Sequence, residues 1–468
     1  MSVGVKATLV FIPFPSMSHL VSAVETAKLL TARDESLAAT ILVMKLPADT
    51  KISSYTETTP HPRINFLHLQ QNKSASSTLT KNRILGFVES HKGPARDAIT
   101  EMMQRQNGRL AAFMLGMFTT PMIDVANELA TPAYIFFPCG SASLGLMLHL
   151  RSLHDDRGGD MTEYEDSDSA IHIPTHVNPV PAKVWPARIF DKDIGFLDFA
   201  RRYKESRGFV INTFLELESH AIASLSTDEK FPPVYPVGPM IQSGGEGTDE
   251  IISWLDEQPR SSVVFLCFGS KGWFESDQVK EIAAALEQSG ARFLWSLRKP
   301  PPKDTMESPG EYENPEQVLP EGFLERSMGI GKVIGWAPQV AVLSHPAVGG
   351  FVSHCGWNSI LESVWCGVPV AAWPLSAEQQ ANAFLLIKEL EMAVEIKMDY
   401  RKNSDVIVDA ETIESAIRRL MDPRNTIRLK AKEMHDQSRT TFVQGGSSYN
   451  SLGRLIESIM DNSFLSTN

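Results

Sequence analysis

Between residues 336 and 379 the chain concentrates side chains that suit a nucleotide diphosphate. Trp336 offers a flat aromatic face on which a base such as uracil can stack. His354, Asn358 and Ser359 offer hydrogen-bond donors for phosphate oxygens. Residue types that bind a base and a diphosphate therefore occur within one short stretch of the chain.

Three further side chains in this stretch suit the sugars of such a ligand. Glu362 can accept hydrogen bonds from both hydroxyls of a ribose. It follows Asn358 by one helical turn, so the two side chains face the same side of a helix. Glu378 and Gln379 supply acceptors and donors for the 3- and 4-hydroxyls of a hexose. The stretch therefore predicts a pocket for a nucleotide sugar.

The elements around these side chains follow from the sequence pattern. Residues 349–354 are predicted to form a buried strand that ends in a polar turn, and residues 356–366 to form the next helix. The unpaired N–H groups and the dipole at a helix N-terminus favour an anion. Gly356 lets the backbone approach that anion closely. A diphosphate at this turn is expected to be held without a metal ion.

A second strand, turn and helix supports this prediction. The apolar, β-branched run 262–268 is followed by Gly269 and Ser270, and a helical pattern covers 276–289. Ser270 therefore lies at the carboxyl end of a predicted strand, where open α/β sheets bind ligands. Taken alone, this pattern is more often plain scaffold, and Trp336 or Trp373 alone would more often be a core aromatic.

The ordered block from Trp336 to Gln379 resembles the signature of plant family 1 UDP-dependent glycosyltransferases, which act on small secondary metabolites. The resemblance implies an α/β protein with two Rossmann-like domains facing a cleft, the GT-B fold. It implies UDP-glucose as the donor, because Trp357 and Gln379 accompany glucose in that family. It also implies a donor site made of Ser270, Trp336, Ala337, Gln339, His354, Gly356, Trp357, Asn358, Ser359, Glu362, Glu378 and Gln379.

His19 is the candidate general base. It follows the first predicted strand, and imidazole titrates near neutral pH. The segment from Phe14 to Leu20 resembles the family's N-terminal motif with its reactive histidine. That resemblance implies that His19 removes the proton of an acceptor hydroxyl, which attacks the anomeric carbon opposite UDP and gives a β-glucoside. Without the resemblance, a histidine at a helix start is more often a surface or capping residue.

Three positions depart from the family's pattern. Ser18 stands where relatives usually have glycine, Gly116 where they have the aspartate that orients the histidine, and Pro138 where many have threonine. Losing an orienting carboxylate is costly in other histidine-based sites, and Asp124 lies nearby only in sequence, inside a predicted helix. Three interpretations stay open. His19 works alone on acidic phenols, water or another polar group orients it, or the protein is a weak or inactive transferase that binds UDP-sugar.

The acceptor pocket is expected in the N-terminal half. Its lining is predicted to include Phe14, Phe87, Phe118, Phe137 and Phe196. Aromatic lining suits a planar phenol such as a flavonoid, a stilbene or a hydroxycinnamate, although any one of these side chains is more often core.

Strand and helix patterns alternate along the chain, which indicates parallel sheets covered by helices. Strands are predicted at 7–13, 39–44, 64–69, 110–115 and 133–137, with helical patterns at 19–30, 79–104 and 121–130. We expect an acceptor-binding domain at 1–242, a linker at 243–252, a UDP-sugar-binding domain at 253–448 and a C-terminal helix at 449–468. By the resemblance, that last helix packs back on the N-terminal domain.

Composition narrows the class of partner. Lys and Arg number 44 against 56 Asp and Glu, a net charge of −12, which disfavours nucleic acid and anionic membranes. Prolines interrupt the apolar runs 7–15 and 132–148, so no membrane span is expected. The four cysteines lie in apolar contexts and indicate reduced thiols in a cytoplasmic protein. A monomer is expected.

No metal, and no cofactor besides the donor co-substrate, is expected. Asp166 and Asp168 match a DxD pattern, but they lie in an acidic loop without a preceding strand, where solvated carboxylates are more common. His354 and Cys355 have no second pair at ligand spacing.

Overall fold

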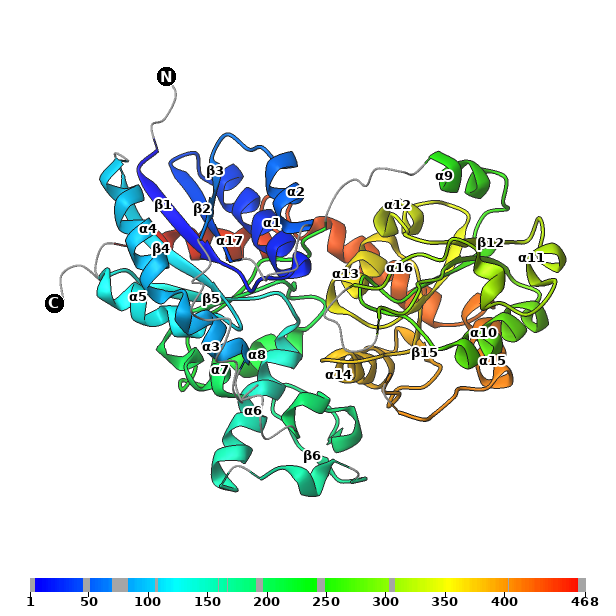
Figure 1. Ribbon diagram of the computed structural model, residues 1–468. Helices are drawn as coiled ribbons and strands as arrows, with labels where there is room; N and C mark the ends of the chain where they lie inside the picture. Colours follow the sequence, from blue (N-terminus) through cyan, green and yellow to red (C-terminus); the bar gives the residue numbers. More distant parts are fainter. Residues whose placement is uncertain are drawn as a thin grey trace.

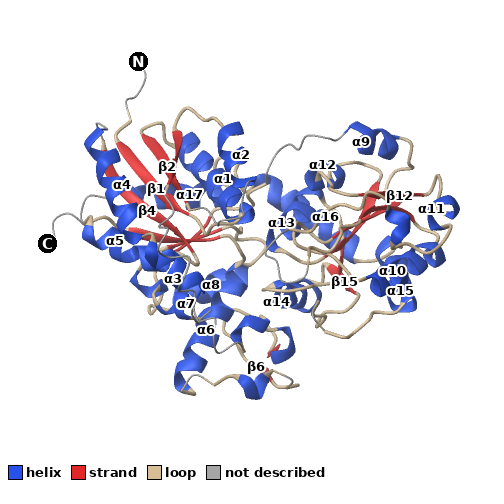
Figure 2. Ribbon diagram, in the orientation of Figure 1, coloured by secondary structure: helices blue, strands red, loops and turns tan. Residues whose placement is uncertain are grey.

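Two parallel sheets, each with helices against both faces, form two lobes that lie side by side (Figures 1 and 2). The computed structural model describes residues 5–44, 51–69, 83–105, 108–158, 160–165, 167–190, 197–241, 249–302, 308–402 and 404–461.

The first sheet has seven strands in the order β3-β2-β1-β4-β5-β8-β9. They are β1 (Ala7–Ile12), β2 (Leu37–Val43), β3 (Ile64–His68), β4 (Arg109–Gly116), β5 (Ala133–Phe137), β8 (Phe209–Ile211) and β9 (Val234–Pro236). Every neighbouring pair is parallel. Along β1, Val10 and Ile12 join one core cluster and Leu9 and Phe11 join the other. Both faces are therefore buried, which is why the strands read as continuous apolar runs.

Helices return the chain between these strands. They are α1 (Met17–Arg33), α2 (Lys51–Thr58), α3 (Arg83–Ser90), α4 (Lys92–Arg105), α5 (Ile123–Glu128), α6 (Ser141–Asp156), α7 (Asp198–Arg201) and α8 (Ser219–Thr227). A small antiparallel pair, β6 (Ala170–Ile171) and β7 (Val180–Pro181), lies in the long excursion between α6 and β8.

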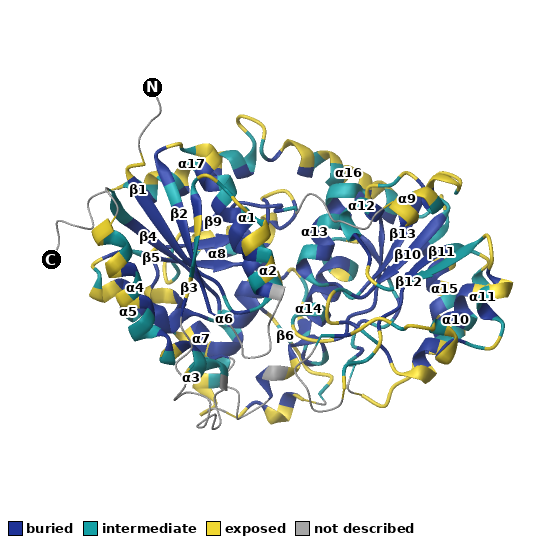
Figure 3. Cartoon of the chain, turned by 45° about the horizontal axis from the view of Figure 1, so that its top comes forward, coloured by how far each residue is buried: buried dark blue, intermediate teal, exposed yellow. Residues whose placement is uncertain are grey.

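The second sheet has six strands in the order β12-β11-β10-β13-β14-β15, again all parallel. They are β10 (Val263–Cys267), β11 (Arg292–Ser296), β12 (Gly331–Ile334), β13 (Val348–Ser353), β14 (Val370–Ala372) and β15 (Ala393–Glu395). Its lobe contains α9 (Asp249–Asp256), α10 (Ser276–Ser289), α11 (Phe323–Arg326), α12 (Gln339–Leu343), α13 (Trp357–Cys366), α14 (Gln379–Phe384), α15 (Ala410–Met421) and α16 (Ile427–Thr440). Figure 3 shows both sheets as buried layers inside partly exposed helices.

Each sheet has one point where its strand order reverses. The chain runs from β1 outward to β3 and then returns to β4 on the other side of β1, and β10 and β13 repeat this arrangement in the second sheet. In open α/β sheets the crevice beyond the carboxyl ends of the strands at such a point is the place where ligands bind. The turns after β1, β4, β10 and β13 are therefore the places to look for function.

The last described helix, α17 (Ser447–Met460), belongs to the core of the first lobe. Its Leu452, Leu455 and Ile459 are buried in the same cluster as β1. The Tyr134 hydroxyl lies 2.7 Å from Ser458 Oγ, and Arg109 donates to the Met460 carbonyl at 3.0 Å. The red end of the chain in Figure 1 accordingly crosses from the second lobe to the first. The helix α9 begins at Asp249, so it overlaps the end of the segment 243–252 that was predicted to be a linker.

Polar contacts also join the two lobes directly. Ser143 Oγ donates to Asn382 Oδ1 at 3.0 Å, and Arg401 donates to the Trp185 carbonyl at 2.8 Å. The Glu389 carboxylate accepts the Val177 N–H at 3.1 Å.

Among the described residues no helix combines the length and the apolar character needed to cross a bilayer.

We predict that Leu455→Ala lowers the free energy of unfolding by about 2 to 5 kcal/mol, because it leaves a cavity in a core that the two ends of the chain share. Leu455 is 0% exposed. Arg454→Ala, on the exposed side of the same helix, is the control and should change stability by less than about 0.5 kcal/mol. Denaturant unfolding followed by fluorescence measures both. Equal effects would show that α17 is not part of the core.

Candidate functional site

His354 lies between the glycine turns that follow β10 and β13. A Cβ atom placed on Gly269 or on Gly356 would stand 2.5 Å from His354 Nε2, so only glycine fits on either side of the ring. Gly269 also has φ +71°, a left-handed conformation that favours glycine. Burial lowers the pKa of His354 to about 4, so the ring is neutral at neutral pH. Its buried Nδ1 has no hydrogen-bond partner among the described residues.

The N-terminus of α13 opens beside this histidine. Gly356 is the N-cap residue with extended backbone, and Trp357 and Asn358 form the first turn. No side chain caps the free N–H groups of this end, which leaves them available for an anion. Ser270 is exposed in the turn after β10, the strand that pairs with β13. The structure therefore brings Ser270, His354 and the start of α13 to one crevice.

A small polar network lies one turn farther along α13. Gln339, the first residue of α12, donates to Ser359 Oγ at 2.8 Å and to Glu362 Oε2 at 2.5 Å. Burial raises the pKa of Glu362 to about 7, although the bond from Gln339 lowers it. The carboxyl is thus held in place while it titrates near neutral pH.

Trp336 carries the exposed aromatic face of the site. Its side chain is 53% exposed, whereas the next residue, Ala337, is 6% exposed. The Arg298 guanidinium lies 5.2 Å from the centroid of the Trp336 ring. An exposed indole at a crevice suits the stacking of a planar base. Trp373 differs, because it is fully buried in an aromatic cluster with Phe274 and so belongs to the core.

Gln379 is the first residue of α14, and Glu378 is the N-cap residue of that helix. Gln379 Oε1 accepts the N–H groups of Leu375 and Ser376 at 2.9 Å each, so its amide oxygen closes the turn and its nitrogen points elsewhere. Burial raises the pKa of Glu378. The Cys139 thiol of the first lobe lies 3.7 Å from Glu378 Oε1.

His19 occupies the facing crevice of the first lobe. It lies in the first turn of α1, shortly after β1, and its ring forms a three-membered cluster with Phe14 and Phe118 at centroid distances of 5.6 Å and 5.8 Å. Burial lowers the pKa of His19 to about 4, so its imidazole is unprotonated at neutral pH and able to accept a proton.

Gly116, which stands where the family's pattern has an aspartate, is tightly packed. Gly116 ends β4, and a Cβ atom there would lie 3.2 Å from the Phe14 backbone nitrogen. Asp124 does not replace it, because its carboxylate pairs with Lys92 and Arg202 at 2.7 Å each on the lobe's surface. No described carboxylate is hydrogen-bonded to His19.

The aromatic residues predicted to line the acceptor pocket fall into different places. Phe14 and Phe118 contact His19 and are partly buried. Phe87 packs on His91 at 4.5 Å. The prediction for Phe137 is wrong, because this side chain is 0% exposed within the core and has no surface to offer a ligand. Phe196 lies outside the described residues.

The first lobe approaches α13 closely at two residues that the sequence did not indicate, Asn212 and Gly140. The Trp357 indole N–H donates to the Asn212 carbonyl at 2.6 Å, and a Cβ on Gly140 would lie 2.8 Å from the same indole. Both residues follow buried strands of the first sheet, β8 and β5. A polar or small residue at a strand's carboxyl end was the available signal.

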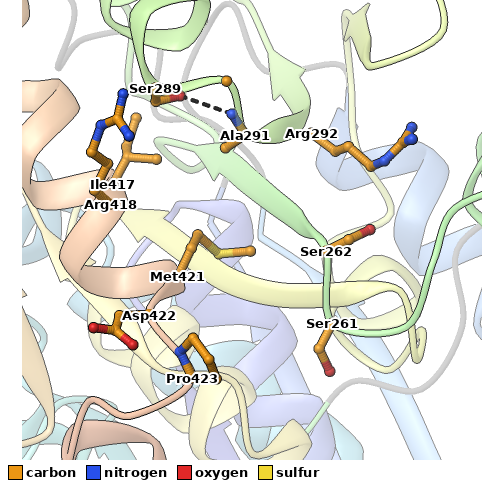
Figure 4. A pocket seen from close by; sticks show the side chains of 11 residues that line it. Ser261, Ser262, Ser289, Ala291, Arg292, Ile417, Arg418, Met421, Asp422 and Pro423 are labelled. Atoms are coloured by element: carbon orange, nitrogen blue, oxygen red, sulfur yellow. Dashed lines mark hydrogen bonds between the residues drawn. The ribbon is translucent and has the colours of Figure 1, made fainter.

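A hollow of about 560 Å³ lies at the other end of the second sheet, before β10 and β11 (Figure 4). Its lining includes Arg292, which already donates to the Gln258 side chain at 2.7 Å, and Arg418, which donates to the Gln288 carbonyl at 2.8 Å. Because the amino ends of the strands face away from the crevice, this hollow is not part of the candidate site.

No three His, Cys, Asp or Glu side chains lie close enough to hold a metal ion in the part of the chain that the structure describes. Asp166 lies outside that part. The Asp168 side chain is 100% exposed, as a solvated loop residue should be.

The chain is similar in sequence to known proteins. A model of the UDP-glucoronosyl and UDP-glucosyl transferase family matches residues 248–437. The chain is 51% identical to the UDP-glucose flavonoid 3-O-glucosyltransferase 6 of Fragaria ananassa, over 96% of this chain and 98% of that protein.

Solved structures extend the likeness to the whole fold. Medicago truncatula UGT71G1 complexed with UDP-glucose has a TM-score of 0.84 and 40% identity, covering 97% of this chain and 99% of that one. Phytolacca americana UGT2 complexed with UDP-2fluoro-glucose and pterostilbene has a TM-score of 0.86 and 32% identity, covering 97% and 100%. The chain therefore belongs to the plant family 1 UDP-dependent glycosyltransferases and is a UDP-glycosyltransferase of the GT-B fold.

Proposed function

We propose that this protein transfers glucose from UDP-glucose to a hydroxyl of a small hydrophobic acceptor, giving a β-O-glucoside. The observation that carries the proposal is the meeting of the two crevices. Asn358 Nδ2, at the start of α13, lies 3.5 Å from Ser22 Oγ, and Ser22 in turn donates to the Ser18 carbonyl of the same helix as His19. The helix that carries His19 and the uncapped N-terminal end of α13 are therefore in contact with each other.

The proposed donor site uses the residues around α13. The uracil stacks on Trp336, the ribose hydroxyls donate to Glu362, and the hexose hydroxyls reach Glu378 and Gln379. The diphosphate receives hydrogen bonds at the start of α13, with His354 and Ser270 beside it. The Medicago structure holds UDP-glucose, which supports this donor.

The proposed chemistry is one inverting displacement. The imidazole of His19 takes the proton of the acceptor hydroxyl while that oxygen attacks the anomeric carbon from the face opposite UDP. The bond from the anomeric carbon to the phosphate oxygen breaks, and UDP leaves with the electron pair. The N–H groups at the start of α13 stabilise the charge that develops on UDP. No metal takes part in this step.

The proposed acceptor is a planar phenol such as a flavonoid, a stilbene or a hydroxycinnamate. Phe14 and Phe118 place aromatic rings beside His19, and such surface suits a planar acceptor. A flavonoid glucosyltransferase among the relatives and pterostilbene in the Phytolacca complex support the same class. Phenols also suit a base without a carboxylate partner, because their hydroxyls lose a proton easily.

A second function is a protein that binds UDP-sugar and transfers little or none of it. The motivating observation is Gly116, which leaves His19 without a described carboxylate partner. The two functions share donor binding and differ only in the product.

We predict that the purified protein forms glucosides from UDP-glucose and a panel of phenols, and that His19→Ala slows this by about 100- to 10,000-fold. Mass spectrometry measures the product, with and without EDTA, which should change nothing. UDP affinity should stay the same in the variant because His19 belongs to the facing lobe. Full activity in His19→Ala would remove His19 from the mechanism, and no product from the unaltered chain would favour the binding protein.

We predict that uridine binds more tightly as the pH rises through about 7. The pKa of the Glu362 carboxyl is raised to about 7, so the group is protonated below that pH and becomes a charged acceptor for the ribose hydroxyls above it. The gain should be about threefold to tenfold, as for hydrogen bonds to a charged group. Uridine has no phosphate that titrates in this range. Calorimetry should show that the uridine affinity of Glu362→Gln does not change with pH. A pH-independent affinity in the unaltered protein would show that Glu362 does not bind the ribose.

We predict that Gly116→Asp raises turnover of aliphatic alcohols more than turnover of acidic phenols, because an orienting carboxylate helps most where proton removal is hardest. The Phe14 backbone nitrogen would lie 3.2 Å from the new Cβ, so the backbone must shift slightly. Gly116→Ala carries the same crowding without a carboxylate and is the control. Equal gains in both variants would trace the effect to packing.

A further inference from the structure

Asn212 is a buried polar residue at the junction of the two lobes. It follows β8 of the first sheet, is 0% exposed, and its backbone N–H donates to the Phe137 carbonyl at 3.0 Å. Its carbonyl accepts the Trp357 indole N–H at 2.6 Å. A fully buried amide side chain must find partners for both its oxygen and its nitrogen.

The direction of the Asn212 side chain is fixed by a neighbour that can only donate. The Met240 backbone N–H lies 2.9 Å from Asn212 Oδ1. A backbone N–H has no lone pair, so the atom facing it must be the amide oxygen. The Asn212 nitrogen therefore faces the other way, toward Asn358 Oδ1 at 3.3 Å.

This direction determines that of Asn358 in turn. The atom of Asn358 that meets the Asn212 N–H₂ has to be an acceptor, so it is the oxygen. The Asn358 nitrogen is then turned toward α1, where it lies 3.5 Å from Ser22 Oγ. One hydrogen of this N–H₂ group is directed at Ser22 Oγ, and the other is left for the diphosphate that is proposed to bind at the N-terminal end of α13.

The orientation matters because phosphate oxygens only accept hydrogen bonds. An amide nitrogen aimed at the diphosphate attracts it, whereas an amide turned by half a rotation would set its oxygen against an anion. Asparagine itself has no strong preference between the two orientations, since its end groups have the same shape. The orientation of the Asn358 amide is therefore set by the groups that surround it.

We propose that Asn212 is a positioning residue of the donor site, which turns the Asn358 amide so that its N–H₂ group faces the diphosphate. The inference rests on the proposed function, namely that Asn358 contacts the diphosphate of UDP-glucose. It assigns to the first lobe a role in donor binding as well as in acceptor binding.

The test compares UDP with uridine in Asn212→Asp. The aspartate has the same shape and still accepts the Met240 N–H, but it cannot donate to Asn358. We expect UDP affinity, measured by calorimetry, to fall by about tenfold, the value of one hydrogen bond to a charged group. Uridine affinity should stay the same, because uridine has no diphosphate. Asn212→Ser, which cannot reach Asn358 and buries no carboxyl, should give the same ratio if Asn212→Asp does not fold.

A second background separates positioning from direct repulsion between the new carboxyl and the ligand. In Asn358→Ala the amide is absent, so adding Asn212→Asp should cost no further UDP affinity. A further loss would show that residue 212 acts on the ligand directly and would overturn the proposal. Ser143→Ala, which removes an interlobe hydrogen bond of 3.0 Å to Asn382, is the matched control and should leave UDP affinity unchanged.

The outcomes also distinguish the two proposals. If the unaltered protein binds UDP no better than uridine, it has no diphosphate site, and both proposals are wrong. Tight UDP binding that persists in Asn212→Asp and Asn212→Ser would leave the proposed function standing and would overturn the role of Asn212 alone.

Discussion

Parallel strands leave all their carboxyl ends at one edge of a sheet, and the position of every polar group in this site depends on that constraint. His19 follows β1 and Ser270 follows β10. In the strands next to them, Gly116 is the last residue of β4 and His354 follows β13. The two reversals of strand order open the sheets at these turns, and the lobes bring the openings together. Most of the chain therefore serves to hold a few short turns opposite one another.

Burial is the second constraint, and it sets the charges of the titratable groups in the site. The same desolvation lowers the pKa values of His19 and His354 and raises those of Glu362 and Glu378. The site is thereby kept low in charge before the ligand enters. Donors that are fixed in a poorly solvated place interact more strongly with an anion than the same groups in water. The glycines around His354 allow this close packing, since a single methyl group on either would displace the ring.

The sequence carries most of the fold because its strands are short apolar runs between clear turn residues. The strand at 133–137 and the helix at 276–289 have the same bounds in the structure. The first helix begins at Met17, two residues before the periodic pattern becomes visible, and residues 83–105 form two helices that break at His91. Family membership, the α/β class and the two-sheet architecture were all predictable from one block of residues.

Side-chain detail was less accessible, and the reasons are physical. Phe137 reads like Phe14 and Phe118 in the sequence, but it points from β5 into the core. Asn212 and Asn358 stand far apart in the chain, and only packing of the two lobes makes them neighbours. Local patterns record the period of a strand or helix, whereas the partner of a polar side chain depends on the tertiary arrangement.

The crossing of α17 back to the first lobe has a consequence for biosynthesis. Leu452, Leu455 and Ile459 complete a core whose other walls are β1, α1 and β2, yet they are translated after every strand of both sheets. As the nascent chain leaves the ribosome, the first lobe has to wait for the second before it can close its apolar face. A ribosome that stalls late in the message would therefore release an almost complete enzyme whose earliest-made half is the part most in need of a chaperone.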